Sequence, residues 1–166
     1  MTTTTAPTNE QSIAIQQLAD MVAAAAAFQD QCQVYSNEEA AAFVHYPHYA
    51  VESQQIDRPF AVIYPKSYTP RRLADGIVMP SGELFLQLGL TMADDNEAEG
   101  EERRFDNWQG DIIKHVHDTD ANAAGFRMLC TQSTPPTRSH PAHVAALGAQ
   151  FPFWFVEYTV NWDPFG

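Results

Sequence analysis

Apolar and polar side chains alternate along residues 151–162, which read FPFWFVEYTVNW. Because successive side chains of a strand point to opposite faces, this pattern predicts a long β-strand with two different faces. One face is apolar throughout and consists of Trp154, Val156, Tyr158, Val160 and Trp162. The other begins with Phe153 and Phe155 and becomes polar at Glu157, Thr159 and Asn161. At roughly 3.3 Å per residue the strand would span about 40 Å, and we expect it to be the core strand of a small antiparallel sheet.

Two other stretches have the three- and four-residue spacing of amphipathic helices. The first is Asn9–Gln33, with Thr8 and Gln11 placed to form a capping box at its start. Its apolar face consists of Ala14, Leu18, Met21, Ala25, Phe28 and Cys32. The second is Glu101–His117, whose apolar stripe consists of Phe105, Trp108, Ile112 and Val116.

Shorter patterns predict the remaining elements. Pro59 opens a strand over Phe60–Tyr64, and Lys66–Ala74 reads as a loop that contains Arg71 and Arg72. A hairpin or one bent strand follows over residues 76–90, with a turn at Pro80-Ser81-Gly82 and a core-facing row of Leu84, Leu86, Leu88 and Leu90. Phe126–Thr134 is a further strand that Pro135 and Pro136 should end, and His140–Gly148 is a short helix. Phe43–Val51 is an irregular or edge segment.

This order of elements predicts an α+β fold. Two long helices must cover the apolar face of a mainly antiparallel sheet of about four strands, which gives a two-layer arrangement. A chain of 166 residues suits one domain. We therefore expect residues 9–166 to form a single domain, preceded by a flexible, Thr-rich arm at residues 1–8.

Composition narrows the class of protein. The formal net charge of −12, with nine Lys and Arg, argues against adhesive binding of DNA, which needs cations opposite phosphates. The N-terminus has no basic region followed by an apolar run, and no apolar stretch approaches the ~20 residues of a bilayer span. We expect a protein without membrane contact that is made in a cytoplasm. Cys32 and Cys130 are expected to be buried thiols rather than a disulfide.

The sequence contains little that indicates catalysis. Three histidine pairs, His45/His48, His115/His117 and His140/His143, have no HExxH motif and no Cys or carboxylate at a metal-ligand spacing. We predict no metal and no cofactor. No GxSxG, Walker A or GxGxxG motif occurs. The clustered carboxylates lie in Thr91–Glu102, where like charges repel, and this stretch is predicted to be a mobile acidic loop.

Layout and pattern resemble those of the tail terminator (tail completion) proteins of long-tailed bacteriophages. The likeness rests on the helix Asn9–Gln33, the strand Pro59–Tyr64, the Leu84–Leu90 strand running into an acidic loop, the helix with Phe105 and Trp108, and the closing FWFVEYTVNW strand. It covers most of residues 9–163. The likeness does not include Phe43–Gln55 or the helix His140–Gly148. A related neck protein is therefore a second interpretation of the same pattern.

The resemblance implies a structural virion protein rather than an enzyme. Such proteins form a ring, commonly a hexamer, at the head-proximal end of the tail tube, where they end tube polymerisation and meet the head connector or a neck protein. DNA passes through the lumen without specific binding. An acidic loop of Asp94, Asp95, Glu97 and Glu99 facing the lumen would repel phosphates. Glu157, Thr159, Asn161, Trp162 and Phe165, at the far end of the last strand, are the candidate subunit interface.

Three alternatives remain open. One is another phage neck protein, either a connector adaptor or a head-closure protein. The second is a small metal-dependent hydrolase that uses the histidine pairs. The third is a host-side binding module whose acidic loop mimics DNA.

Overall fold

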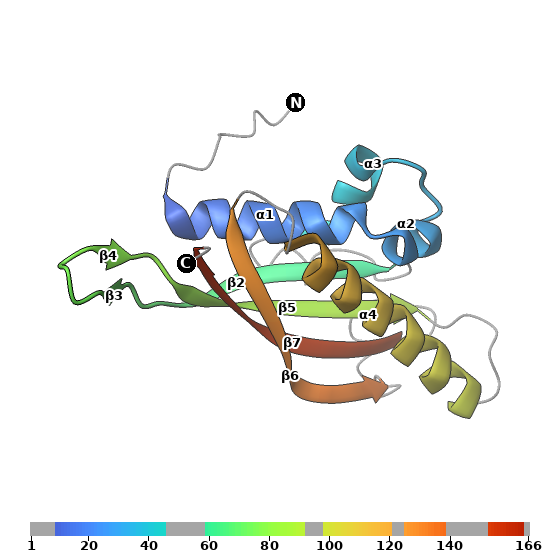
Figure 1. Cartoon of the computed structure of the whole chain (residues 1–166). Helices are drawn as coiled ribbons and strands as arrows, with labels where there is room; N and C mark the ends of the chain where they lie inside the picture. The colour runs from blue at the N-terminus through green and yellow to red at the C-terminus, as the bar shows by residue number, and fades with distance from the viewer. Residues whose placement is uncertain (1–8, 46–58, 92–97, 121–124, 139–152, 165–166) are drawn as a thin grey trace.

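The long C-terminal strand lies inside a five-stranded sheet with a neighbour on each side. The computed structural model describes residues 9–45, 59–91, 98–120, 125–138 and 153–164. β7 (Phe153–Pro164) pairs antiparallel with β5 (Gly82–Thr91) and with β6 (Phe126–Arg138). β5 pairs antiparallel with β2 (Phe60–Tyr68), and β1 (Val44–His45) pairs parallel with β2. The strand order is β1-β2-β5-β7-β6 (Figure 1).

One face of this sheet carries the helices. α1 (Glu10–Ala24) and α4 (Ala98–Asp120) pack there, α2 (Ala26–Cys32) packs on α1 and α4, and α3 (Asn37–Ala41) packs on α1 (Figure 1). The apolar rows predicted for β5 and β7 are buried beneath them, together with the predicted stripes of both long helices. The Trp108 indole also donates to the Ala27 carbonyl at 3.2 Å, which joins α4 to α2.

The structure confirms an α+β fold with a mainly antiparallel sheet and corrects the expected number of elements. The described sheet has five strands rather than about four, and the described residues contain four helices rather than two. Cys32 and Cys130 are both buried, as expected, and form no disulfide. The cap of the first helix is Asn9, whose side chain accepts the Ser12 N–H at 2.9 Å, rather than the predicted Thr8. The N-terminal arm and the helix His140–Gly148 lie outside the described residues.

The first predicted helix is broken in two at Ala25. Its ψ of 125° is extended, so the chain turns there even though alanine is the best helix former. The turn lets α2 bring Phe28 against Trp108 of α4, with ring centroids 6.3 Å apart. Tertiary packing therefore overrides the local helix propensity of the alanine run.

Two prolines do not end the strand of residues 126–138. β6 was expected to stop before Pro135, but it continues to Arg138 through two register shifts, between Gln132 and Thr134 and between Thr134 and Thr137. β6 is an edge strand, and an edge tolerates residues that lack an N–H donor. The extension carries Arg138 to a position opposite Trp154.

The predicted loop Lys66–Ala74 is mostly strand. β2 continues past Pro65 to Tyr68 through a register shift, and β3 (Arg71–Arg72) then pairs with β4 (Val78–Met79). This two-stranded ribbon projects beyond the end of the main sheet (Figure 1). Gly76, with a φ of 87°, provides the left-handed residue at its tip.

Candidate functional site

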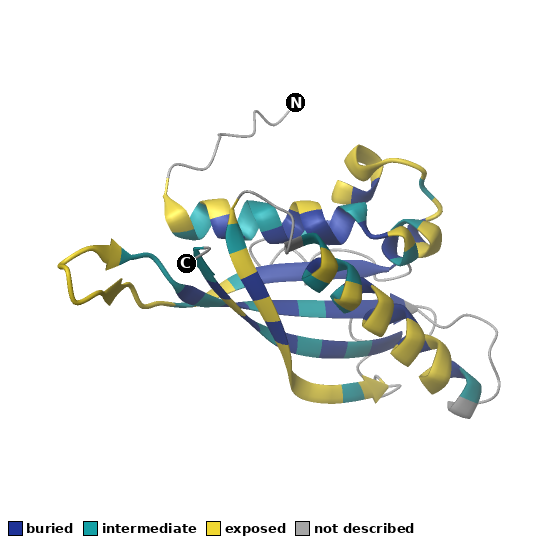
Figure 2. Cartoon of the chain, in the orientation of Figure 1, coloured by how far each residue is buried: buried dark blue, intermediate teal, exposed yellow. Residues whose placement is uncertain are grey.

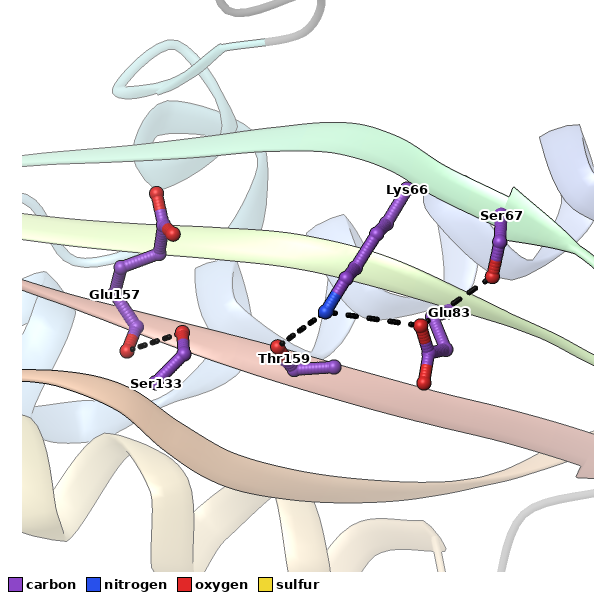
Figure 3. Close-up of polar contacts among 6 residues, drawn as sticks. All are labelled: Lys66, Ser67, Glu83, Ser133, Glu157 and Thr159. Carbon is purple, nitrogen blue, oxygen red and sulfur yellow. Dashed lines mark hydrogen bonds and ion pairs between the residues drawn. The ribbon is translucent and has the colours of Figure 1, made fainter.

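The face of the sheet opposite the helices is the candidate functional surface, and we call it the outer face. Its two ends differ, as the alternation in β7 predicted. At one end Phe60, Val62 and Phe153 form a buried apolar cluster, with Tyr64 and Phe155 packed against it. At the other end the side chains are polar and partly exposed (Figure 2). The polar patch is defined as Lys66, Ser67, Glu83, Ser133, Glu157 and Thr159 (Figure 3).

Glu157 joins three strands of this face. Its Oε2 accepts a hydrogen bond from the Tyr64 hydroxyl of β2 at 2.8 Å. Its backbone carbonyl accepts from the Ser133 hydroxyl of β6 at 3.1 Å (Figure 3). Its backbone N–H donates to the Thr134 hydroxyl oxygen at 3.1 Å. Burial, followed by the hydrogen bond and negative charge of Glu157, raises the pKa of Tyr64 well above its usual range. Tyr64 is therefore a neutral donor that holds the Glu157 carboxylate in place.

Lys66 is the cation of the polar patch. Its Nζ donates to the Thr159 hydroxyl at 3.3 Å and lies 3.7 Å from Glu83 Oε2 (Figure 3). The Ser67 hydroxyl donates to the same carboxylate oxygen at 3.3 Å, and the ammonium lies 4.9 Å from the centre of the Phe85 ring. Lys66 and Glu83 are each about one-third exposed, so their ion pair contributes little stability in water. These groups can exchange intramolecular contacts for contacts with a partner at little cost.

The carboxylates of the outer face are hydrogen-bonded to hydroxyl groups of another strand. Glu157 accepts from Tyr64, and Glu83 accepts from Ser67. Within the described ranges, no three His, Cys, Asp or Glu side chains converge in a way that could hold a metal ion. The face thus presents partly exposed charged and hydroxyl groups from several strands of the sheet.

The structure places the residues of the candidate subunit interface on opposite sides of β7. Glu157, Thr159 and Asn161 are on the outer face, and Asn161 is exposed. Trp162 points the other way and is 1% exposed, so the expectation that it is available to a partner is wrong. β5 and β6 flank β7 to its end, and Trp162 packs on Tyr68 and Phe126 with ring centroids 5.9 and 4.7 Å apart. Phe165 lies outside the described residues.

The acidic stretch is in part a helix. Asp94, Asp95 and Glu97 lie outside the described residues, but Glu99 is in the first turn of α4 rather than in a loop. Carboxylates at a helix start are stabilised by the helix dipole, which offsets their mutual repulsion. Within the described part of the acidic stretch, Glu101 is buried, with 1% of its surface exposed. Its Oε2 accepts hydrogen bonds from Arg138 Nε at 3.0 Å and from Trp154 Nε1 at 3.1 Å.

Sequence reasoning missed the burial of Glu101, although a signal was present. Glu101 is four residues before Phe105 and therefore on the same stripe as Phe105, Trp108 and Ile112. A carboxylate in line with an apolar stripe must be paired if it is buried. Its partner Arg138 follows two prolines and was not expected to lie within a strand.

The described histidines have separate structural partners. His117 Nε2 accepts the backbone N–H of Cys130 at 3.0 Å, and His115 Nε2 lies 3.3 Å from the Thr119 hydroxyl. Burial lowers the pKa of His45, which is on β1. His48, His140 and His143 lie outside the described residues. The Cys130 N–H points away from β7, at the free edge of β6. Because it is bonded to His117, it is not available to pair with another strand.

Comparisons with known proteins do not assign the chain to a family. No protein-family model matches the chain, and a search of curated proteins gives no match. Among the described helices, none combines the length and hydrophobicity that crossing a membrane requires. The function is therefore inferred from the residues of this chain.

Proposed function

We propose that the chain is a structural virion protein. Its copies form a ring, which we propose to be a hexamer, at the head-proximal end of a phage tail tube. The ring ends tube polymerisation and joins the tail to the head connector. The proposed partners are further copies of the chain, the tail tube protein and a neck protein. DNA passes through the lumen, and assembly takes place in the host cytoplasm.

The polar patch is the observation that carries this proposal. It lies on the uncovered end of the outer face, where Glu157 and Thr159 are held by cross-strand hydrogen bonds and Asn161 is exposed beside them. Polar and charged groups on a surface give a protein contact specificity when the partner presents complementary groups. The resemblance of the element order to tail terminator proteins supports the same assignment.

The charge of the chain is compatible with DNA passage. A net charge of −12 repels phosphates, so a lumen lined by this protein would let DNA slide rather than adhere. A ring also needs two different complementary surfaces on each copy, because its contacts are heterologous. The polar patch is the proposed first surface.

Light scattering and negative-stain imaging test the proposal. We expect the purified chain to form a concentration-dependent oligomer and ring-shaped particles, and to bind the ends of isolated tail tubes. Asn161→Arg should weaken the oligomer at least tenfold, because it places a bulky cation beside the polar patch. Ala41→Arg, at an exposed position of α3, adds the same cation away from the polar patch, and as the control it should leave the oligomer unchanged. A chain that remains monomeric and never binds tubes contradicts the proposal, and binding to heads rather than tails favours a connector adaptor or head-closure protein.

A further inference from the structure

The two-stranded ribbon is an ordered projection rather than a loose loop. We call residues 69–81, which contain β3 and β4, the arm. At its base the Thr69 N–H donates to the Ser81 carbonyl at 2.9 Å, and the Ser81 hydroxyl donates to the Thr69 carbonyl at 2.6 Å. Nearer the tip the Leu73 N–H donates to the Ile77 carbonyl at 2.8 Å. The arm leaves the sheet between β2 and β5 and extends away from the helices (Figure 1).

Apolar side chains are concentrated on this arm. Leu73, Ile77 and Val78 are 43%, 61% and 49% exposed. They are three of the seven large hydrophobic residues that are exposed in the described parts of the chain, and Tyr68 at the arm's base is a fourth. Single exposed apolar residues are ordinary, but a cluster on a projection indicates a binding surface.

The arm also carries two cations that form no ion pair with another described residue. Lys66, Lys114, Arg127 and Arg138 each form an ion pair with a carboxylate of the same chain. Arg71 and Arg72 are exposed and form no ion pair within the described ranges, although Arg72 Nη1 donates to the Gly76 carbonyl at 3.2 Å. Asp75 also lies on the arm, so the arm has a net charge of +1, and the rest of the chain has 20 acidic and seven basic residues, a net charge of −13. The arm is thus a cationic extension of an acidic molecule.

That charge distribution favours a second copy of the chain as the partner. Two arginines on a strongly acidic protein are a poor basis for binding DNA or anionic lipid, because the rest of the chain is repelled by phosphates. The same acidity makes another copy of the chain an attractive surface for the arm. Opposite charges on opposite ends of identical molecules favour head-to-tail contacts.

A complementary surface lies on the helix layer. A hollow of about 410 Å³ between α2 and α4 is lined by Ala26, Ala27, Asp30, Asp111, Lys114, His115 and Asp118. Lys114 pairs with Asp118 at 3.5 Å, whereas Asp30 and Asp111 are exposed and form no ion pair within the part of the chain that the structure describes. Ala26 and Ala27 form the apolar part of a lining that is otherwise charged or polar. α2 and the arm lie at opposite ends of the molecule, so the arm cannot reach this hollow on its own copy (Figure 1).

We propose that the arm of one copy docks in the α2–α4 hollow of a second copy. Arg71 and Arg72 leave opposite faces of the ribbon, so one faces Asp30 of α2 and the other faces Asp111 of α4 in that copy. Leu73, Ile77 and Val78 are covered by the alanines and the surrounding helix surface. Because the contact joins two different surfaces, its repetition closes a ring or builds a filament. This inference rests on the proposed ring function and names the second surface that such a ring needs.

A charge-swap experiment tests the docking. Arg71→Glu with Arg72→Glu, and separately Asp30→Arg with Asp111→Arg, should each raise the dissociation constant of the oligomer at least tenfold in analytical ultracentrifugation. The variant with all four substitutions should recover association, because the attraction is restored with reversed signs. Ile77→Ser with Val78→Ser should also weaken association. Leu129→Ser removes an equally exposed apolar side chain from β6 and should not. Circular dichroism checks that each variant is folded.

The outcomes separate this inference from the proposed function. Arm variants that associate as tightly as the native chain overturn the docking while the ring function stands. Weakening by both double variants without recovery in the fourfold variant also overturns it, since the two surfaces then do not meet. Arm-dependent oligomers that never bind tail tubes support the docking and contradict the proposed function. A native chain that is monomeric at all concentrations contradicts both.

Discussion

The indole Nε1 of Trp154 donates a hydrogen bond to the carboxylate of Glu101, 3.1 Å away and 53 residues earlier in the chain. The same oxygen accepts from Arg138, so one buried carboxylate joins α4, β6 and β7 at the end of the sheet where α4 begins. A buried charge is tolerated only when it is paired and hydrogen-bonded. The three residues therefore form a structural joint rather than a catalytic group.

Glu101→Gln should destabilise the fold by about 1.5–3 kcal/mol, the usual contribution of hydrogen bonds to a charged group. The amide oxygen can still accept from both Arg138 and Trp154, but it is neutral, so both hydrogen bonds weaken and the Arg138 charge loses its partner. Urea unfolding followed by circular dichroism measures the change. The neighbouring Glu102→Gln, at an exposed position, is the control and should stay within about 0.5 kcal/mol of the native chain. Equal stability of the two variants would show that the joint contributes nothing.

Gly82→Ala should destabilise the protein by about 1–3 kcal/mol, the usual cost of overpacking. A Cβ on Gly82 would lie 2.5 Å from the Ser67 carbonyl oxygen and 2.9 Å from Trp162 Nε1, and the first of these is backbone that cannot move aside cheaply. Thermal unfolding measures the effect.

Gly110→Ala is the matched control for Gly82→Ala and should have the opposite sign. Gly110 is in the interior of α4, and a Cβ there would meet nothing within 4 Å. Alanine should stabilise the helix by about 0.5–1 kcal/mol. A destabilising Gly110→Ala would mean that the exposed side of α4 is covered.

The stability of the protein should fall at alkaline pH. Burial, with smaller contributions from Cys130 and Asp106, raises the pKa of Tyr158 to about 12, above the ordinary value of 10.0. Below pH 10 the tyrosine is neutral in both the folded and the unfolded chain, so its contribution to the free energy of unfolding is unchanged. Between pH 10 and 12 the unfolded chain ionises and the folded chain does not, which lowers the free energy of unfolding.

Urea unfolding at a series of pH values checks this effect. Tyr158→Phe should make the decline between pH 10 and 12 shallower, because the substituted side chain has no proton to lose. A variant whose stability falls as steeply as that of the native chain would assign the decline to other groups, such as Tyr64, whose pKa is also raised.

Local patterns were enough to predict several elements. The Leu84–Leu90 row, the β7 alternation and the stripe from Phe105 to Val116 all lie on the buried sides that their periods predicted. Helices and strands repeat over a few residues, so the side that faces the core can be read from the order of side chains alone. The change of β7's second face from apolar to polar was predicted in the same way, and it marks the polar patch.

Long-range contacts decided the rest. The break at Ala25 follows from the packing of Phe28 on Trp108, the burial of Trp162 from the two strands that flank β7, and the pairing of Glu101 from a strand that continues past two prolines. The first part of the arm was expected to be a loop, because β3 has two residues and is too short to show a period, whereas β4 lies in the stretch that was predicted to be a hairpin or one bent strand. The sequence by itself determined which side of each long element is apolar. Which elements meet, and so which polar groups are buried or exposed, depends on contacts between residues far apart in the chain, and only the tertiary structure decided that.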